Sequence, residues 1–535
     1  MAAAGTHEED SARRWLKVQG GAVKCVRGLA VGVDAGYVPG RNLDAVRLST
    51  LLASLPALTS IGSPGEPVSL CADAHRTPTA AAVRAFLAGA ARAIGRCSGL
   101  QSLHLGITLL GGLADQLPEA LVRALASVRT LEEVNLTFET FEDSRPDWPV
   151  TFSLAHLVAG LAGLPRLRAL ILTVQNVCMD ATLPASVSRL AQLTYLRLSD
   201  IHGLRCEPGW ARLPALARLQ FVDCEFAGDG EAALPGMDAL AALTSLELDR
   251  CPSLRLLPAS LWRLSQLRCL SHDAQTWDEA GEPRSAVSVL GLPLSAPCFA
   301  SLTELTLTGH NLRMPLGGAP CFASLTRLTL AARNLQAFPL CILAATRLQY
   351  LELADCCFGQ LPEGVSALTS LEELHHGWPS LVEKEVGGSI DARALGSLAA
   401  FPFLRRLSFE NCSVQFSSNF QAAAAHLRLE ELKLTTAYPG GPTCMAFLDY
   451  VCALMKQGRA CVLGLVGSRV RGAGRRSSSS FRAALDAAGF PFEYDAYSSA
   501  EEASDWKSSD EESSDWDSSS DEEESSDGQA HVPAV

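Results

Sequence analysis

The chain has 535 residues, of which 48% are hydrophobic and 19% charged, so it is long enough to bury a large core. Of its net charge of −14, residues 501–527 contribute −12 through 13 acids and one lysine, which leaves −2 for the remainder. The sequence has no basic excess suited to nucleic acid and no run of about 18 apolar residues that would span a membrane, which excludes both classes of partner.

The first segment, residues 1–22, is a lead-in to the structured part of the chain. It carries acids where a secretory signal has a basic and then an apolar run, so we expect an intracellular, cytoplasmic protein. From residue 23 to 162, alternating apolar segments such as LQSLHL and LEEVNL recur at steps of about 30 residues or more. Intervening runs such as PEALVRALASV have apolar residues three and four apart, which predicts helices.

A shorter repeat begins at residue 163. The segments LPALARLQFVDCEF, LTSLELDRCPSL and LQYLELADCCF share the frame L-x-x-L-x-L-x-x-(N/C)-x-L. The L-x-L alternation predicts a short strand with one buried face, and neighbouring units must stack to bury that face. Eleven frames lie 23 to 35 residues apart, and their first leucines are Leu167, Leu193, Leu216, Leu243, Leu267, Leu302, Leu325, Leu348, Leu371, Leu404 and Leu429.

This frame resembles the leucine-rich repeat. The resemblance implies an α/β fold, a curved horseshoe-shaped solenoid of about 15–16 repeats with parallel strands on its concave face. The middle repeats are similar to those of plant resistance proteins and intracellular Ras-pathway scaffolds, and residues 23–162 are similar to the longer ribonuclease-inhibitor type. The family includes cytoskeletal and axonemal proteins of algae, so the resemblance implies such a location, and the arginine- and alanine-rich usage is typical of a GC-rich alga.

Two polar, turn-rich segments interrupt the repeats, and we expect loops at residues 271–298 and 375–400. The other expected divisions follow from the rhythm of the leucines and from the change in composition near the end of the chain. They are a lead-in at 1–22, longer repeats at 23–162, short repeats at 163–270 and 299–374, C-terminal repeats at 401–466, a basic linker and capping segment at 467–497, and a disordered acidic tail at 498–535.

No motif has the spacing of a catalytic or metal site. Gly-Lys, H-E-x-x-H and G-x-S-x-G do not occur, and the 17 cysteines include no C-x-x-C pair. His375 and His376 adjoin, but adjacent side chains point apart, so we expect an exposed loop pair and no metal ligands. Cysteines in the (N/C) position, such as Cys251, are expected to be reduced and buried at a turn. The sequence therefore predicts no enzyme, no cofactor and no metal.

The residues between the leucines of each strand should line the concave face and form columns across neighbouring strands. Four acids from three successive repeats are expected to form one acidic patch there, with aromatic side chains on the same face. We therefore expect a protein or peptide partner with a basic surface. Its expected contacts are Tyr195, Asp200, Asp223, Glu247, Asp249, Arg250, Tyr350, Glu352, Asp355, His375 and Trp378.

The tail has few apolar residues and dense like charge, so it should not fold alone. Trp506 and Trp516 repeat in an S-D-W triplet, which resembles short docking motifs such as those read by kinesin light chains. Within residues 504–527, six serines have an acid three residues further on, which resembles acidophilic, casein-kinase-type sites and implies a kinase as a partner of the tail. These serines are Ser508, Ser509, Ser514, Ser518, Ser519 and Ser520.

The sequence thus favours a non-catalytic interaction scaffold with a phosphorylatable acidic tail. One alternative is a substrate adaptor of a ubiquitin ligase, because many F-box proteins carry such repeats, although only about 25 residues precede the first frame and no F-box is recognisable. Another alternative is an enzyme with its site in the inserts, which no motif supports. The oligomeric state is left open by the sequence.

Overall fold

The structure is a computed structural model that divides into two compact units, Met1–Glu493 and Tyr494–Val535, and every described residue belongs to the first. The tail serines and tryptophans, Asp355 and Trp378 lie outside the described residues. The described residues are 28–29, 58–63, 67–71, 88–89, 91–109, 117–140, 152–175, 179–273, 289–291, 297–309, 311–313, 322–332, 335, 338–354, 356, 362–377, 389–390, 401–410, 413–414, 430–435 and 462–465.

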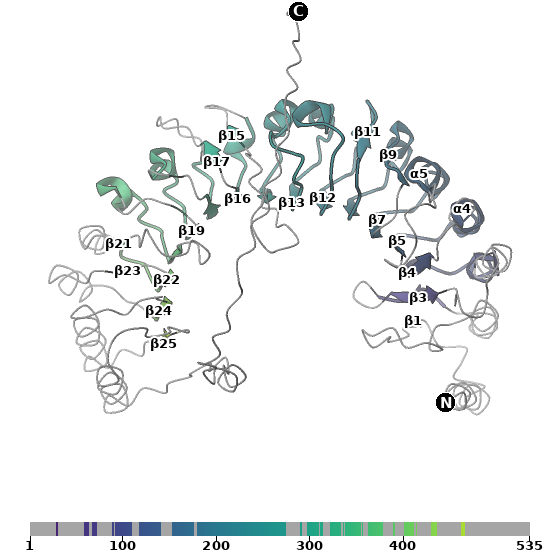
Figure 1. The fold of residues 1–535 in the computed structure, drawn as a ribbon, viewed down its shortest axis with the longest axis horizontal. Helices are drawn as coiled ribbons and strands as arrows, with labels where there is room; N and C mark the ends of the chain where they lie inside the picture. Colours follow the sequence, from purple (N-terminus) through teal and green to yellow (C-terminus); the bar gives the residue numbers. More distant parts are fainter. Residues whose placement is uncertain are drawn as a thin grey trace, which may run out of the picture. The chain divides into compact units, whose positions relative to one another are not determined.

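Within the described residues, one parallel sheet of 17 strands runs through this unit, and its strands follow the order of the chain, except that β2 and β3 both pair with β4 (Figure 1). Its strands are β1 Gly28–Leu29, β2 Ser60–Ile61, β3 Val68–Cys71, β4 Ser102–Leu109, β5 Glu133–Thr140, β7 Ala169–Gln175, β10 Tyr195–Ser199, β12 Arg218–Val222, β13 Ser245–Asp249, β14 Cys269–Asp273, β16 Glu304–Thr308, β18 Arg327–Ala331, β19 Tyr350–Ala354, β20 Glu373–Gly377, β22 Arg406–Glu410, β24 Glu431–Thr435 and β25 Val462–Leu465.

The number of strand positions agrees with the repeat count from the sequence. Strands β2 and β3 pair with successive parts of β4, so the 17 strands fill sixteen positions within the described residues. All pairs are parallel and in register, so that Leu196, Leu219 and Leu246 lie beside one another in β10, β12 and β13. The predicted fold class, a leucine-rich-repeat solenoid, is therefore confirmed.

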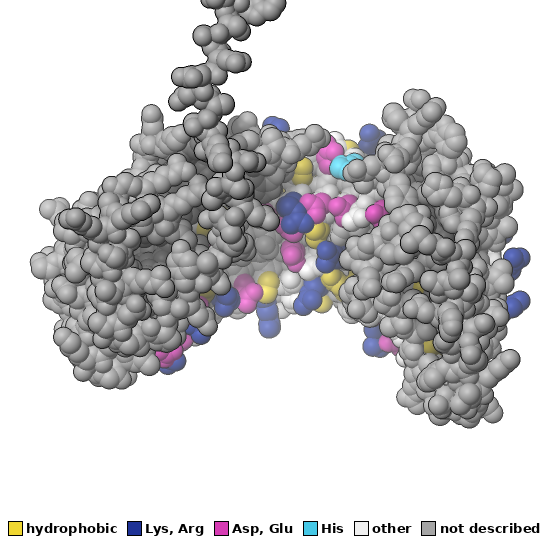
Figure 2. Space-filling model, turned by 60° about the horizontal axis from the view of Figure 1, so that its bottom comes forward, with side chains coloured by type: hydrophobic (Ala, Val, Ile, Leu, Met, Phe, Trp, Pro, Cys, Tyr) yellow, Lys and Arg dark blue, Asp and Glu magenta, His cyan; other side chains and the backbone are white. Residues whose placement is uncertain are grey.

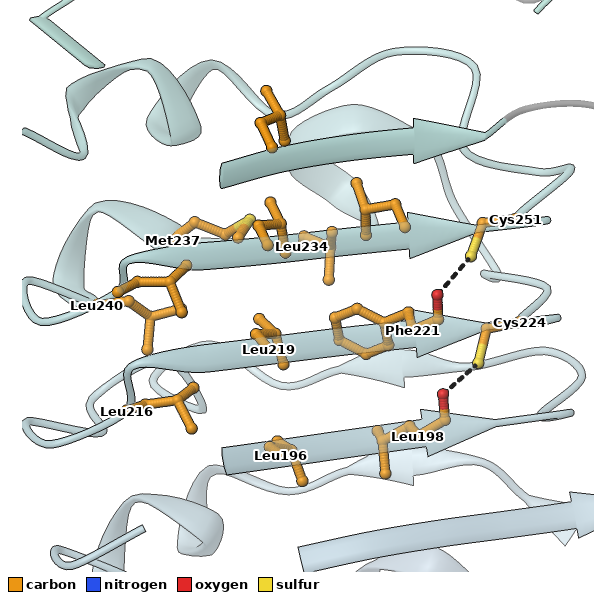
Figure 3. Packing of buried hydrophobic residues seen from close by; sticks show 14 of the residues in the cluster. Leu196, Leu198, Leu216, Leu219, Phe221, Cys224, Leu234, Met237, Leu240 and Cys251 are labelled. Atoms are coloured by element: carbon orange, nitrogen blue, oxygen red, sulfur yellow. Dashed lines mark hydrogen bonds between the residues drawn. The ribbon is translucent and has the colours of Figure 1, made fainter. Parts of the chain in front are cut away.

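The leucines of each frame build one continuous core (Figure 3). Along β13 the residues alternate between half-buried and buried, because successive side chains of a strand point to opposite faces. Leu246 and Leu248 point inward and are fully buried, as are their counterparts in the neighbouring repeats. Burial of one leucine side chain contributes about 1.5–3 kcal/mol, so the stacked rows are the main source of stability.

The segments that connect one sheet strand to the next contain short helices. These helices lie across the core from the sheet and form the outer side of the stack (Figure 1). Pro184, Pro258, Pro339 and Pro362 directly precede four of the 3-10 helices, where a missing backbone donor is tolerated. The helices are α4 Leu117–Ser127, α5 Leu154–Leu161, η3 Ala185–Arg189, η4 Gly230–Ala232, η5 Met237–Ala239, η6 Ala259–Arg263, η7 Pro297–Ala300, η8 Leu340–Ala344 and η9 Glu363–Ala367.

Strand residues also occur in both segments that the sequence assigns to loops. Strands β14 and β20 include the first three residues of each segment, and their third inward position holds His272 or His376 in place of leucine. The leucine frame therefore stops too early when it is read from the sequence alone. Each segment also contributes one strand to a short parallel pair, β15 Val289–Gly291 with β17 Asn311–Arg313 and β21 Ser389–Ile390 with β23 Ser413–Val414. Two similar pairs lie earlier in the chain, β6 Phe152–Ser153 with β8 Met179–Asp180 and β9 Thr182–Leu183 with β11 Arg205–Cys206.

The (N/C) position of the frame is a buried turn that holds a thiol. The Cys224 and Cys251 thiols donate to the carbonyls of Leu198 and Phe221, one strand earlier, with S···O distances of 3.4 and 3.6 Å (Figure 3). Burial raises the pKa of Cys224 to about 12 and raises the pKa of Cys251 as well. Because the thiolate is the nucleophilic form, these thiols are suited to packing and not to covalent chemistry.

Gly62, between β2 and β3, has a left-handed backbone with a φ of 72°, and a Cβ added there would lie 2.6 Å from the His104 carbonyl oxygen. We expect Gly62→Ala to lower the free energy of unfolding by about 3 kcal/mol, since a backbone clash adds to the left-handed penalty of about 1–2 kcal/mol. Gly203→Ala is the matched control, because Gly203 has a φ of 68° and no atom within 4 Å of an added Cβ. Urea unfolding curves measure both, and equal losses would contradict the steric argument.

Candidate functional site

The polar side chains of the central strands lie on the face of the sheet opposite the leucine core, and they form columns because the strands are in register. Figure 2 shows acidic and basic side chains gathered over the middle of this face. We call it the concave face. The column between the second and third inward residues of each strand contains Arg197, Gln220, Glu247, Ser271, Thr306, Thr329, Glu352, His375, Ser408 and Lys433.

Five carboxylates from four successive repeats form an acidic patch, which we define as Asp200, Asp223, Glu247, Asp249 and Asp273. Burial raises the pKa of Asp249, and the charges of Asp273, Asp223 and Glu247 raise it further against the opposing effect of Arg250. Burial and the charge of Asp223 likewise raise the pKa of Asp200. The sequence predicted the first four of these acids and missed Asp273, because the leucine frame of β14 appeared to stop before it.

Arg250 lies inside this patch and bonds two of its members. Its Nε and Nη2 donate to Oδ1 and Oδ2 of Asp223, both at 2.6 Å, and its Nη1 lies 3.3 Å from Oδ2 of Asp249. The hydrogen bonds that Arg250 donates to Asp223 raise the pKa of Arg250, which stays charged. Five carboxylates and one guanidinium leave the patch with a net charge of −4 when all are ionised.

Three residues at the end of neighbouring strands have left-handed backbones without being glycine: Asp200, Asp223 and Arg250 have φ values of 59°, 51° and 50°. The Asp200 N–H donates to the Val222 carbonyl and the Asp223 N–H to the Asp249 carbonyl, each at 2.9 Å. The ladder of hydrogen bonds therefore continues one residue beyond the strands. After this turn the Arg250 side chain reaches Asp223, the residue that follows β12.

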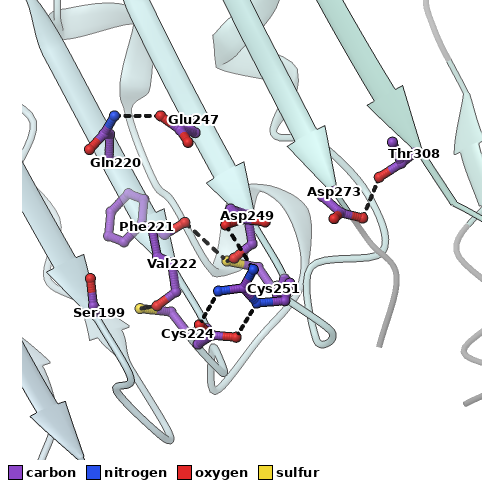
Figure 4. Close-up of polar contacts among 12 residues, drawn as sticks. Ser199, Gln220, Phe221, Val222, Cys224, Glu247, Asp249, Cys251, Asp273 and Thr308 are labelled. Atoms are coloured by element: carbon purple, nitrogen blue, oxygen red, sulfur yellow. Dashed lines mark hydrogen bonds and ion pairs between the residues drawn. The ribbon is translucent and has the colours of Figure 1, made fainter. Parts of the chain in front are cut away.

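A second row of hydrogen bonds links the same three strands nearer their starts. The Tyr195 hydroxyl donates to Oε1 of Gln220 at 2.5 Å. Nε2 of Gln220 donates in turn to Glu247 (Figure 4). The Arg218 guanidinium lies over the Tyr195 ring, 5.8 Å from its centroid. On the next strands the Thr308 hydroxyl donates to Asp273 (Figure 4). Hydrogen bonds between neighbouring strands thus hold these side chains in position.

A second aromatic cluster lies on β18–β20. Arg327 lies 4.3 Å from the Tyr350 ring centroid, and the His375 ring lies 5.1 Å from it on the neighbouring strand. The Tyr350 hydroxyl donates to Glu352 at 2.8 Å, and burial together with this bond raises the pKa of Tyr350. His375 is therefore a half-buried residue of the concave face. The prediction that His375 and His376 form an exposed pair in a loop was wrong. His376 is buried behind the sheet, and its Nδ1 forms a hydrogen bond with the Leu353 carbonyl at 3.0 Å.

Ser102, His104 and Glu133 form a polar cluster on β4 and β5 that sequence analysis missed. Ser102 Oγ lies 2.8 Å and Glu133 Oε1 3.9 Å from Nε2 of His104, so both approach the same ring nitrogen. A Ser-His-acid triad places the serine and the acid on different nitrogens, and Nδ1 of His104 makes no hydrogen bond with the described residues. Burial lowers the pKa of His104, and Glu133 opposes that shift. This cluster does not have the geometry of a triad.

No trio of histidine, cysteine or acidic side chains within the described ranges is placed to hold a metal ion. The helices found in those ranges include none with the length and apolar character of a membrane span.

The stacked parallel strands with one buried leucine face define the class of protein, a leucine-rich-repeat solenoid. No family model and no curated protein sequence matches the chain. Among solved structures it is similar to a leucine-rich-repeat protein of Leptospira interrogans, LIC12759, with a TM-score of 0.44 and 14% identity over 84% of this chain and 98% of that one. It is also similar to a chain from the Drosophila Toll–Spätzle complex, with a TM-score of 0.41 and 15% identity over 73% of this chain. The match spans 57% of that second chain. The fold assignment rests on the strand register of this chain itself.

Proposed function

We propose that this protein is a non-catalytic scaffold that binds a protein or peptide with a basic surface on its concave face. The observation that carries the proposal is the acidic patch, in which five carboxylates surround one guanidinium on the exposed face of the sheet. Complementary charge favours a basic partner and speeds its association. The hydrogen-bonded rows favour binding as well, because side chains that are already ordered lose little entropy on contact.

The proposed footprint extends from Tyr195 to the cluster around Tyr350. Six strand steps separate β10 from β19, which corresponds to about 29 Å at the usual strand spacing. Tyrosine and arginine dominate the energy of many interfaces, so Tyr195 and Tyr350 are proposed as contacts at the two ends of the footprint. Glu352 and His375, which lie beside Tyr350, are proposed as contacts as well. Asp355 and Trp378 belong to the proposal on the basis of the sequence alone.

The tail is proposed as a separate regulated element. Its six serine sites support phosphorylation by an acidophilic kinase, and Trp506 and Trp516 support docking of a second partner. An intracellular location, and within it a cytoskeletal or axonemal one, is proposed from the family resemblance alone.

Reversing two charges of the patch tests this function. We expect the double variant Asp223→Lys with Glu247→Lys to weaken binding of a basic partner by about tenfold or more, because attraction becomes repulsion. Quantitative recovery of bound proteins from the native cell measures the effect. The control is Glu225→Lys with Asp238→Lys, which makes the same charge change at exposed acids outside the patch. Unchanged recovery by the patch variant would contradict the proposed site.

A further inference from the structure

We infer that Asp223 and Asp249 form a guanidinium cradle, which Arg250 fills in the free protein and from which an arginine side chain of the partner displaces it. This inference rests on the proposed function and names the residue type that the acidic patch reads. The partner is thus a protein segment that presents arginine, with further cations beside it.

The geometry of the cradle is suited to a guanidinium. Both oxygens of Asp223 accept parallel hydrogen bonds from Arg250 at 2.6 Å, and Asp249 contacts the third nitrogen at 3.3 Å. This is the fork-to-fork arrangement in which a planar guanidinium meets a carboxylate. A lysine ammonium is a compact point charge and cannot occupy both oxygens of Asp223 and the Asp249 oxygen with one flat group.

Arg250 is held in a way that permits exchange. Its side chain is 46% exposed and that of Asp223 is 37% exposed, so water and salt reach the ion pair. Ion pairs of this exposure contribute little to folding, and both charges stay accessible to an incoming group. An arginine from a partner can therefore take over the bonds to Asp223 while the Arg250 side chain swings into solvent.

The charge around the cradle favours a second cation. Even with Arg250 in place, Asp249 faces the carboxylates of Asp273, Asp223 and Glu247. Glu247 accepts a hydrogen bond from the neutral Gln220 amide, and that contact does not compensate its charge. This excess attracts a positively charged segment and repels phosphate-bearing ligands, which selects a basic protein segment as the occupant.

The test compares two arginine removals on the same face. Arg250→Ala empties the cradle, whereas Arg197→Ala removes an equal charge from a side chain that hydrogen bonds Ser199 and no patch carboxylate. The probes are an arginine–serine repeat peptide and a lysine–serine peptide of equal length and charge, and calorimetry on the full chain measures their affinities. We expect the native protein to prefer the arginine peptide several-fold. Arg250→Ala should raise its affinity about tenfold, and Arg197→Ala should raise both affinities by a smaller and equal factor.

Asp223→Asn completes the design, because asparagine tolerates the left-handed backbone but lacks the second charged oxygen. It should abolish the preference for arginine while circular dichroism remains native. Equal effects of Arg250→Ala and Arg197→Ala, or equal affinity for the two peptides, would overturn the cradle and leave the proposed function standing. Failure of both peptides to bind the native protein and Arg250→Ala would overturn the proposed function itself.

Discussion

Replacement of Phe221 by alanine is expected to lower the free energy of unfolding by about 3–5 kcal/mol. Phe221 is fully buried in β12, and its ring meets the edges of Trp210 and Phe226 at centroid distances of 6.4 and 5.2 Å. Removal of the ring leaves a cavity between two repeats. Because each repeat contacts only its neighbours, the substitution should weaken mainly the packing that joins β12 to β10 and β13.

Two measurements make this expectation specific. Denaturant unfolding gives the total loss, and hydrogen exchange of the β10–β13 amides shows whether opening starts at the altered repeat. The control is Phe403→Ala, because Phe403 is 60% exposed and its removal should change stability by only about 0.5 kcal/mol. A loss below about 1 kcal/mol for Phe221→Ala would mean that this core is not packed as described.

Acidification is expected to remove about 3 kcal/mol of stability through His272 between pH 6.5 and pH 4. Burial lowers the pKa of His272 to about 4, although Asp273, the Leu248 backbone and Asp229 act in the opposite direction. The unfolded chain binds the proton near pH 6.5, whereas the folded chain does not bind it until about pH 4. Neutral imidazole is therefore compatible with folding above pH 6.5, and stability declines as the pH falls below that value.

His272→Leu restores the leucine frame of β14 and removes this proton-binding site. We expect the variant to be at least as stable as the native protein at pH 7 and to lose about 3 kcal/mol less at pH 4. Urea unfolding at the two pH values measures the difference. His202→Gln is the control, since the His202 side chain is 67% exposed. Identical pH dependence of the native protein and His272→Leu would show that His272 is not kept neutral by folding.

The leucine spacing predicted most of the fold. A short strand with a leucine at every second position has one apolar face, and a row of such strands buries that face by stacking side by side. The same spacing predicted that Cys224 and Cys251 would be buried at turns. It failed at His272 and His376, where imidazole fills a leucine position. A histidine in that place is read as polar from the sequence, and only the surrounding core shows that it is buried.

The sequence predicted which charged residues lie together in the candidate site, but it did not predict the hydrogen bonds between them. Parallel register follows from the repeat, so acids on successive strands were expected to lie together. The place of Arg250 among them did not follow, because Arg250 lies in a left-handed turn after β13 and bonds Asp223 at the end of the neighbouring strand. The cluster of Ser102, His104 and Glu133 was missed for a related reason, since it requires the exact pairing of β4 with β5.

The register of the sheet has a mechanical consequence. Strand pairs that follow one another in a stack carry a pulling force in series, so the pair with the fewest partners yields first. From β10 to β20 most neighbouring strands share five residue pairs, whereas β13 with β14 and β19 with β20 share four. Both shorter pairs end at a histidine, His272 or His376. Under tension applied between β10 and β20, rupture should start at these two joints, and the repeats between them should separate as one block.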